Sequence, residues 1–181
     1  METDLSTYNN KWYKPGSHLK RFLWYFINEL FLKNRYNPSS SIKLFWLKCF
    51  GAKIGNGVVV KPSVNIKYPW KLKIGNHCWI GEDVWIDNLD EVTIGDHVCL
   101  SQGAFLICGN HNYKSTAFDL IVKPIHIESG AWIGSKSIVG PGVTVGSHAV
   151  LSLGSVASNN LDSFSIYRGN PAIKIKSRNI V

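Results

Sequence analysis

The chain has 181 residues, a length that fits one domain with appendages. It carries 20 Lys and Arg against 12 Asp and Glu, a net charge of +8, which favours phosphate-bearing ligands or an anionic membrane surface as partners. No nucleic-acid motif accompanies this charge, so we expect no nucleic-acid partner. The four cysteines form no C-x-x-C pair, and a reducing compartment is the simplest setting for them.

Two helices are predicted before any repeat begins. Residues 1–16 read as a loose polar and aromatic lead. Residues 17–34 have apolar side chains at three- and four-residue steps, with Ser17 as N-cap, and a shorter helix follows at about 41–50. The apolar stretch 22–32 is too short to span a bilayer, and no signal peptide is predicted.

These helices, within residues 1–51, have two interpretations. They can cap the open end of a repeat array. Alternatively, residues 17–50 make peripheral contact with a membrane through an apolar face rimmed by cations. The rim would consist of Lys11, Lys14, Lys20, Arg21, Lys33 and Arg35.

A six-residue rhythm dominates the middle of the chain. Each hexad starts with an aliphatic residue followed by a small or turn residue, and the starting residues include Ile54, Ile74, Ile80, Ile94, Ile127, Ile133, Val139, Val145 and Leu151. This period fits neither an amphipathic helix nor simple strand alternation. It predicts a short strand and a corner, three of which close a coil whose strands pair in parallel with the next coil. We expect the Gly after the aliphatic residue to supply the corner's backbone freedom.

The rhythm fails once, at about residues 106–124. Hexads repeat at twenty residues before this break and at eighteen after it, but Ile94 and Ile127 are 33 apart. About 13–15 residues must therefore leave the coil, which is too many for a corner and is typical of a functional loop. His111 lies at the base of this predicted loop.

The motifs around the break resemble one family. Gly109-Asn110-His111, Pro124-Ile125-His126-Ile127, Trp132-Ile133-Gly134, Gly154-Ser155-Val156 and Gly169-Asn170-Pro171-Ala172 are similar to motifs of the hexapeptide-repeat acyltransferases. The helical lead and Phe50-Gly51-Ala52 resemble the exopolysaccharide, colanic-acid type O-acetyltransferases in particular. The resemblance implies a mainly β, left-handed parallel β-helix over residues 52–160, with a short N-terminal helical cap, an extruded loop at 106–124 and a basic tail at 161–181.

The resemblance implies acetyl-CoA as co-substrate and a sugar or glycan hydroxyl as acceptor. It implies no metal cofactor. His111 would be the general base, since an imidazole takes up and releases protons near neutral pH. The backbone N–H of Ser135 would stabilise the oxyanion. Acceptor contacts are expected from Asp87, Asn88 and Asn110.

The same resemblance implies a coenzyme site along the later coils. Its expected residues are Trp132, Gly134, Ser135, Leu153, Gly154, Ser158, Lys174, Lys176 and Arg178. The family often has Thr-Lys after the Gly-Ser-Val motif, where this chain has Ala157-Ser158-Asn159. The three cations of the tail would then supply the phosphate contacts.

Three other functions stay open at this point. One is an acetyltransferase for another small acceptor, such as serine or an antibiotic. Another is a metal hydratase like the γ-carbonic anhydrases, because His77, His97 and His148 share one hexad slot. The third is a non-catalytic scaffold.

Assembly and location follow from the same resemblance. It implies a homotrimer, with Trp79, Trp85 and Trp132 turned outward at hexad positions that suit an interface. We expect a cytoplasmic protein, with the inner membrane surface as the alternative location.

Overall fold

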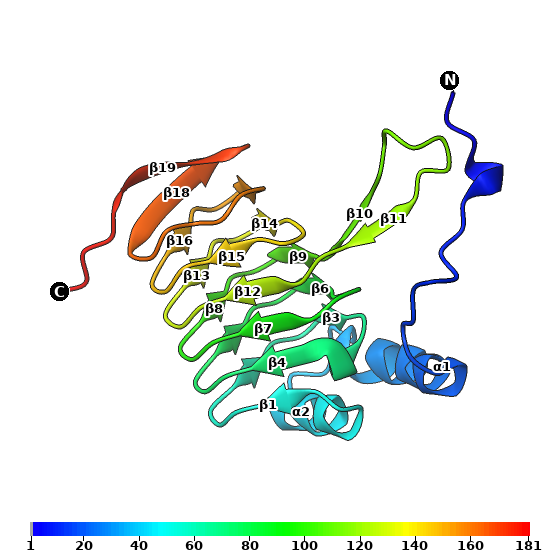
Figure 1. Ribbon diagram of the computed structural model, residues 1–181. Coiled ribbons are helices and arrows are strands. Elements are labelled where there is room, and N and C mark those ends of the chain that lie inside the picture. Colours follow the sequence, from blue (N-terminus) through cyan, green and yellow to red (C-terminus); the bar gives the residue numbers. More distant parts are fainter. Residues whose placement is uncertain (1) are drawn as a thin grey trace.

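The repeats fold into a stack of coils. The computed structural model describes residues 2–181 and forms a parallel β-solenoid of about six turns, with two helices at the first coil and a hairpin leaving the stack (Figure 1). Each coil contributes one short strand to each of three sheets. The fold predicted from the hexads is therefore confirmed as a parallel solenoid.

The three sheets follow the coil order. The first contains β1 (Lys53–Ile54), β4 (Leu72–Ile74), β7 (Val92–Ile94), β12 (Ile125–Ile127) and β15 (Thr144–Val145). The second contains β2 (Val59–Val60), β5 (Trp79–Ile80), β8 (Cys99–Leu100), β13 (Trp132–Ile133), β16 (Val150–Leu151), β18 (Ser165–Gly169) and β19 (Ala172–Ser177). The third contains β3 (Asn65–Ile66), β6 (Trp85–Asp87), β9 (Phe105–Ile107), β14 (Ile138–Val139) and β17 (Val156–Ala157).

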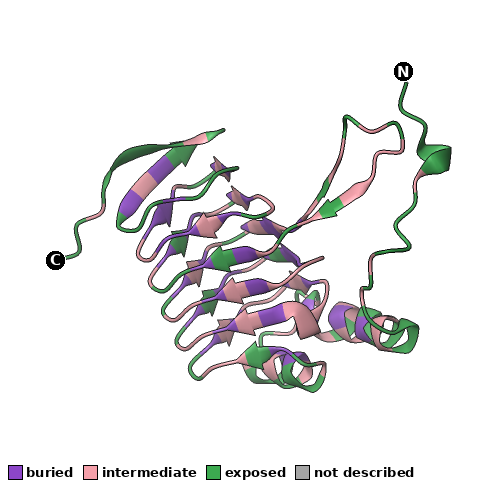
Figure 2. Cartoon of the chain, viewed as in Figure 1, coloured by how far each residue is buried: buried purple, intermediate pink, exposed green. Residues whose placement is uncertain are grey.

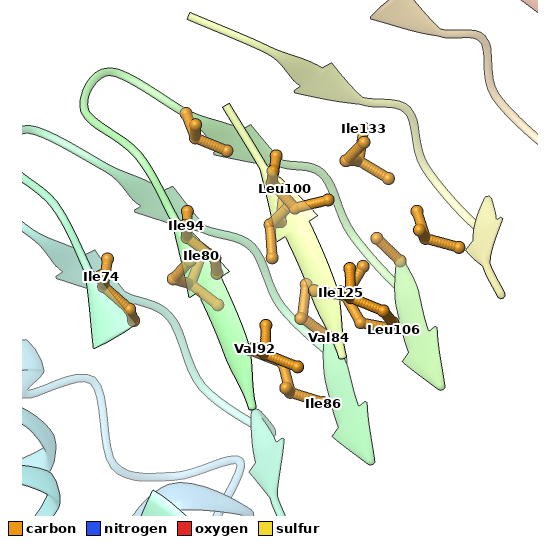
Figure 3. Packing of buried hydrophobic residues seen from close by; sticks show 14 of the residues in the cluster. Ile74, Ile80, Val84, Ile86, Val92, Ile94, Leu100, Leu106, Ile125 and Ile133 are labelled. Atoms are coloured by element: carbon orange, nitrogen blue, oxygen red, sulfur yellow. The ribbon is translucent and has the colours of Figure 1, made fainter. Parts of the chain in front are cut away.

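The hexad aliphatic residues form a continuous column inside the coils. Ile80 pairs with Leu100, Leu100 with Ile133, and Ile133 with Leu151, and all four side chains are fully buried. Figure 3 shows Ile80, Leu100 and Ile133 within this packing. A strand of two or three residues cannot bury an apolar face by itself. Stacking in register is what removes this surface from water.

The corners work differently from the expectation for the hexad glycines. Gly75 does not adopt a positive φ; a Cβ there would lie 2.3 Å from Asp96 Oδ1 of the next coil. The left-handed residue comes two positions later, for example at His77 (φ 54°) and His97 (φ 56°). The explanation by backbone freedom is therefore wrong for Gly75, which is required by the close approach of adjacent coils.

The N-terminal helices pack on the first coils. α1 (His18–Ile27) is capped by Ser17, whose side chain accepts a hydrogen bond from the Lys20 amide, as predicted. It runs into a π-helical turn, η2 (Asn28–Leu32), and α2 (Ser40–Cys49) follows. The short 3-10 turns are η1 (Leu5–Thr7) and η3 (Pro69–Lys71). Trp24 is buried and donates from Nε1 to the carbonyl of Ile66 at 2.8 Å, so α1 does cover the solenoid.

The C-terminal segment differs from the expected tail. β18 pairs in parallel with β16, and β19 pairs antiparallel with β18, so residues 165–177 extend the second sheet. Ser165 and Tyr167 are buried while their neighbours are not. This period-two alternation continues the sheet after the six-residue rhythm has ended.

Candidate active site

His111 lies on the hairpin that leaves the solenoid. β10 (Gly109–His111) pairs antiparallel with β11 (Leu120–Val122), and His111 is opposite Leu120. The hairpin is closed at its base by the Lys123 amide, which donates to the carbonyl of Cys108 at 3.0 Å. A Cβ at Gly109 would lie 2.7 Å from Leu89 Cδ1, so a larger residue there would displace the Leu89 side chain.

The His111 ring is held by the far end of the same hairpin. Its Nδ1 lies 2.9 Å from the carbonyl oxygen of Phe118, and the two rings stack at 4.4 Å with 9° between their planes. A carbonyl only accepts, so in the neutral imidazole Nδ1 carries the proton and donates. Nε2 is then left with a free lone pair, as a general base requires.

Phe118 is the residue that sequence reasoning missed. Its φ is +52°, a conformation that is rare for a large side chain and costs free energy. This backbone conformation accompanies the hydrogen bond that the Phe118 carbonyl accepts from His111 Nδ1. The sequence offers no local signal for it, since Phe is not a residue that favours positive φ.

An N-terminal arm reaches the same place. The Asp4 amide donates to the carbonyl of Thr116 in the hairpin, and the ring of Tyr8 lies 5.8 Å from the ring of His111. Nearer the coils, Tyr13 Oη donates to the carbonyl of Leu89 at 2.5 Å. Burial raises the pKa of the Tyr13 phenol above its usual range, which keeps it a donor. The segment that the sequence predicted to be a loose lead therefore contacts the hairpin through Asp4 and the ring of His111 through Tyr8.

Asn88 does not match its expected role at a solvent-facing acceptor contact. It is fully buried, its Oδ1 accepts from the amide of Tyr68 at 2.9 Å, and its Nδ2 donates to the carbonyl of Tyr68 at 2.6 Å. Both ends of the amide thus hold the neighbouring coil, twenty residues earlier. The structure corrects the expectation: Asn88 has no accessible surface for an acceptor.

Asp87 faces a cleft between α1–η2 and the third sheet. The cleft has a volume of about 350 Å³ and includes Arg21, Tyr25, Asn28, Lys67, Tyr68, Trp85 and Asp87 in its lining. Lys67 Nζ lies 2.8 Å from Asp87 Oδ1. Within residues 2–181 no group donates to the buried Oδ1 of Asn28. The cleft therefore combines aromatic faces with carboxylate, amide and cationic groups.

Asn110 is exposed and precedes His111 directly. Its Oδ1 accepts from the His111 amide at 2.8 Å, so in this structure its side chain folds back onto the hairpin.

Four of the expected coenzyme residues lie together. Trp132, Gly134, Ser135 and Leu153 line one cavity of about 220 Å³ on the second sheet, with Val150, Leu151 and Ser152. The amides of Gly134 and Lys136 donate to the carbonyls of Leu151 and Gln102. Among the hydrogen bonds of residues 2–181, the amide of Ser135 between them has no protein acceptor. The structure thus leaves an unused N–H donor beside an apolar groove.

The other expected coenzyme residues are not in the lining of this groove. Gly154 directly follows Leu153, Ser158 follows β17, and both residues are exposed. Lys174 pairs with Asp162 at 3.0 Å, and Lys176 is exposed on β19. Arg178 Nη1 donates to the carbonyls of Gly130 and His148, each at 3.1 Å, and so attaches the C-terminal segment to the coils.

The histidines of the shared hexad slot lie on the corners. The rings of His77 and His97 stack at 5.2 Å on adjacent coils, and both residues are exposed. In the part of the chain that the structure describes, no group of three or more His, Cys, Asp or Glu side chains is arranged to hold a metal ion.

Residues 124–156 match the family model described as the hexapeptide repeat of succinyl-transferase. The chain is 37% identical to a putative colanic acid biosynthesis acetyltransferase of Escherichia coli K12 over 97% of both chains. It is 28% identical to the galactoside O-acetyltransferase of the same organism, over 71% of this chain and 64% of the relative.

Solved structures share the fold. A hexapeptide-repeat acetyltransferase of Vibrio cholerae complexed with acetyl coenzyme A superposes with a TM-score of 0.80 at 22% identity, over 90% of this chain and 88% of that one. A galactoside acetyltransferase in complex with coenzyme A gives a TM-score of 0.79 at 25% identity, over 89% and 82%. The chain belongs to the hexapeptide-repeat acetyltransferase family.

Replacing Asn88 separates its structural role from acceptor binding. Asn88→Ala leaves the Tyr68 amide without its partner in a buried position, so we expect the free energy of unfolding to fall by about 1–3 kcal/mol. Chemical denaturation measures this, with the exposed Asn159→Ala as a matched control that shifts stability by less than about 0.5 kcal/mol. An unchanged stability combined with a raised KM for the acceptor would contradict the structural role.

Proposed function

We propose that this chain transfers an acetyl group from acetyl-CoA to a sugar hydroxyl in the assembly of an exopolysaccharide or related glycan. Membership of the acetyltransferase family supports the reaction class. The printed names of its relatives, a colanic acid biosynthesis acetyltransferase and a galactoside O-acetyltransferase, support a glycan acceptor. The single observation that carries the mechanism is the hydrogen bond between His111 Nδ1 and the Phe118 carbonyl.

His111 acts as the general base in this proposal. Its Nε2 accepts the proton of the attacking hydroxyl, and the imidazolium formed can then protonate the departing thiolate sulfur. The Phe118 carbonyl keeps the ring in the required tautomer and also stabilises the charged form, because a carbonyl accepts from Nδ1–H in both states. The proton is thus held on the chain between bond formation and departure of the leaving group.

The Ser135 groove fits the donor. Acetyl-CoA would supply the activated acetyl group as a thioester. Trp132 and Leu153 offer apolar contacts for the pantetheine arm, and the free Ser135 amide can donate to the oxygen on which negative charge develops. Gly154, Ser158, Lys174, Lys176 and Arg178 are proposed to extend this contact toward the phosphates. Arg178 would do so with the nitrogens that the Gly130 and His148 carbonyls do not occupy.

The acceptor side is proposed to involve Asp87 and Asn110. Asp87 faces the aromatic cleft near the hairpin base, and its neighbours there include Trp85 and Tyr68. Aromatic faces and carboxylates suit the apolar faces and hydroxyl groups of a sugar ring. In this cleft Asp87 pairs with Lys67 and Glu29 pairs with Lys33, which favours a neutral polar ligand over a free phosphate.

A homotrimer is part of the proposal. Trp79, Trp85 and Trp132 are each about half exposed on the outer faces of the coils, where three prisms can pack against one another. The unpaired cysteines suit a reducing cytoplasm, where we place the reaction.

Removing the base tests the mechanism. His111→Ala is expected to lower kcat by roughly 10²–10⁴-fold, because proton removal then falls to water. Release of the coenzyme thiol with a glycan acceptor measures this. The matched control is His126→Ala, an exposed histidine on β12, which keeps wild-type kcat. A folded His111→Ala protein with full activity would refute the assignment.

Replacing Asp87 tests the acceptor side. Asp87→Asn removes the charge but keeps the shape, so KM for the acceptor should rise about tenfold while KM for acetyl-CoA stays the same. Asp83→Asn on the neighbouring corner is the control, since it is exposed and Asn tolerates its φ of 58°. Equal changes in both KM values would argue against an acceptor contact.

Sedimentation tests the assembly. The proposal predicts a particle with the mass of three 20.3-kDa chains, which stays intact at the protein concentration of the activity assay. A fully active monomer would contradict the trimer and any site shared between chains.

A further inference from the structure

The first helix and the π-helical turn after it expose apolar side chains to solvent. Their inner side is mixed, with Trp24 and the polar Asn28 buried against the first coils. Their outer side is apolar: Leu19, Phe22, Leu23, Phe26 and Leu30 are 68%, 61%, 47%, 48% and 60% exposed. Leu19, Phe22, Leu23 and Phe26 fall on one stripe of α1, because an α-helix has 3.6 residues per turn, and Leu30 follows in the π-helical turn η2. We call them the outer face of α1–η2.

Aromatic side chains pack against one another on this face. The ring centroids of Phe22 and Phe26 are 5.0 Å apart and those of Tyr25 and Phe26 are 5.4 Å apart, both in edge-to-face geometry. On α2, Ile42 and Phe45 are also exposed. Both helices lie at the same end of the solenoid and carry exposed segments (Figure 2). Single exposed apolar residues are common on proteins, but a grouped set marks a surface that is covered in use.

Cations lie near both ends of the outer face. Residues 11–35 contain six Lys and Arg side chains and a single acidic one, Glu29, which is already paired with Lys33. Lys11, Lys14 and Arg21 gather around the start of α1, where they line one surface hollow. Lys33 and Arg35 follow its end. An apolar stripe with cations at both ends is complementary to a surface with an apolar interior and an anionic outer layer.

We infer that the outer face of α1–η2 docks the enzyme on an anionic lipid bilayer, with Leu19, Phe22, Leu23, Phe26 and Leu30 inserted at the headgroup boundary and the flanking cations on the lipid phosphates. Such in-plane helices insert an apolar face while cations remain at headgroup depth. In the described residues no helix is long and apolar enough to cross a membrane, so the contact is peripheral. The inference goes beyond acetyl transfer, because it concerns a surface at the first coil and not the His111 hairpin.

Vesicle binding tests this without acetyl-CoA or acceptor, so its result is independent of the proposed reaction. The purified full chain is mixed with vesicles of phosphatidylglycerol and phosphatidylcholine, or of phosphatidylcholine alone, and the bound fraction is measured by co-sedimentation. We expect binding to the anionic vesicles that weakens with added salt, and much weaker binding to the neutral ones.

Matched variants locate the contact. Phe22→Ser with Phe26→Ser should lower the partition coefficient at least about tenfold, because two large apolar side chains are lost from the inserted face. Ile173→Ser with Ile180→Ser removes two exposed apolar residues from the C-terminal segment, at the opposite end of the chain (Figure 1), and should leave binding unchanged. Lys14→Glu with Arg35→Glu should abolish the preference for anionic vesicles.

Three results would overturn the inference. The first is no binding of the wild-type chain to anionic vesicles. The second is equal binding of wild type and the Phe22/Phe26 double variant. The third is a change in the sedimenting mass of that double variant, which would show that a second copy of the chain covers the face. Circular dichroism of each variant confirms that the solenoid has folded.

Discussion

The whole molecule depends on the parallel register that keeps inward aliphatic side chains stacked from coil to coil. Each strand has only two or three residues in most coils, so its stability comes from neighbours above and below rather than from itself. Any insertion must leave and re-enter without shifting this register. The hairpin does so at Cys108, whose amide donates to the carbonyl of Asp87 and whose carbonyl accepts from Lys123. Burial raises the pKa of the Cys108 thiol to about 11, so it stays neutral in this packed position.

The proposed chemistry uses groups that this framework orients through the backbone. The Phe118 carbonyl orients His111, and the coil corner at Gly134–Lys136 leaves the Ser135 amide free. Main-chain groups in a rigid scaffold need little reorganisation as charge develops, which is the basis of electrostatic preorganisation. Tyr8 and Phe118 add aromatic rings on the imidazole, which restrict its movement.

Much of this architecture could be predicted from the sequence, because the same pattern of a buried aliphatic residue followed by a corner repeats in every hexad. The strand positions, the break and the place of His111 all follow from the period. The role of Asn88 was not predictable, since burial of a corner residue depends on the coil twenty residues earlier. The strained Phe118 and the arm contact of Tyr8 were also invisible, because they depend on tertiary contacts between segments without a repeat. Residues 165–177 differ from the predicted tail because β18 alternates buried and less buried residues with a period of two, which a six-residue repeat does not reveal, and β19 then pairs with it.

The most direct test of the account is a crystal structure of the protein with acetyl-CoA. The account predicts that the thioester carbonyl accepts a hydrogen bond from the Ser135 amide, and that His111 Nε2 faces the carbonyl carbon across a space the size of one hydroxyl group. It also predicts that His111 Nδ1 keeps its bond to the Phe118 carbonyl. Coenzyme bound away from the Ser135 groove, or a His111 ring turned away from the thioester, would contradict it.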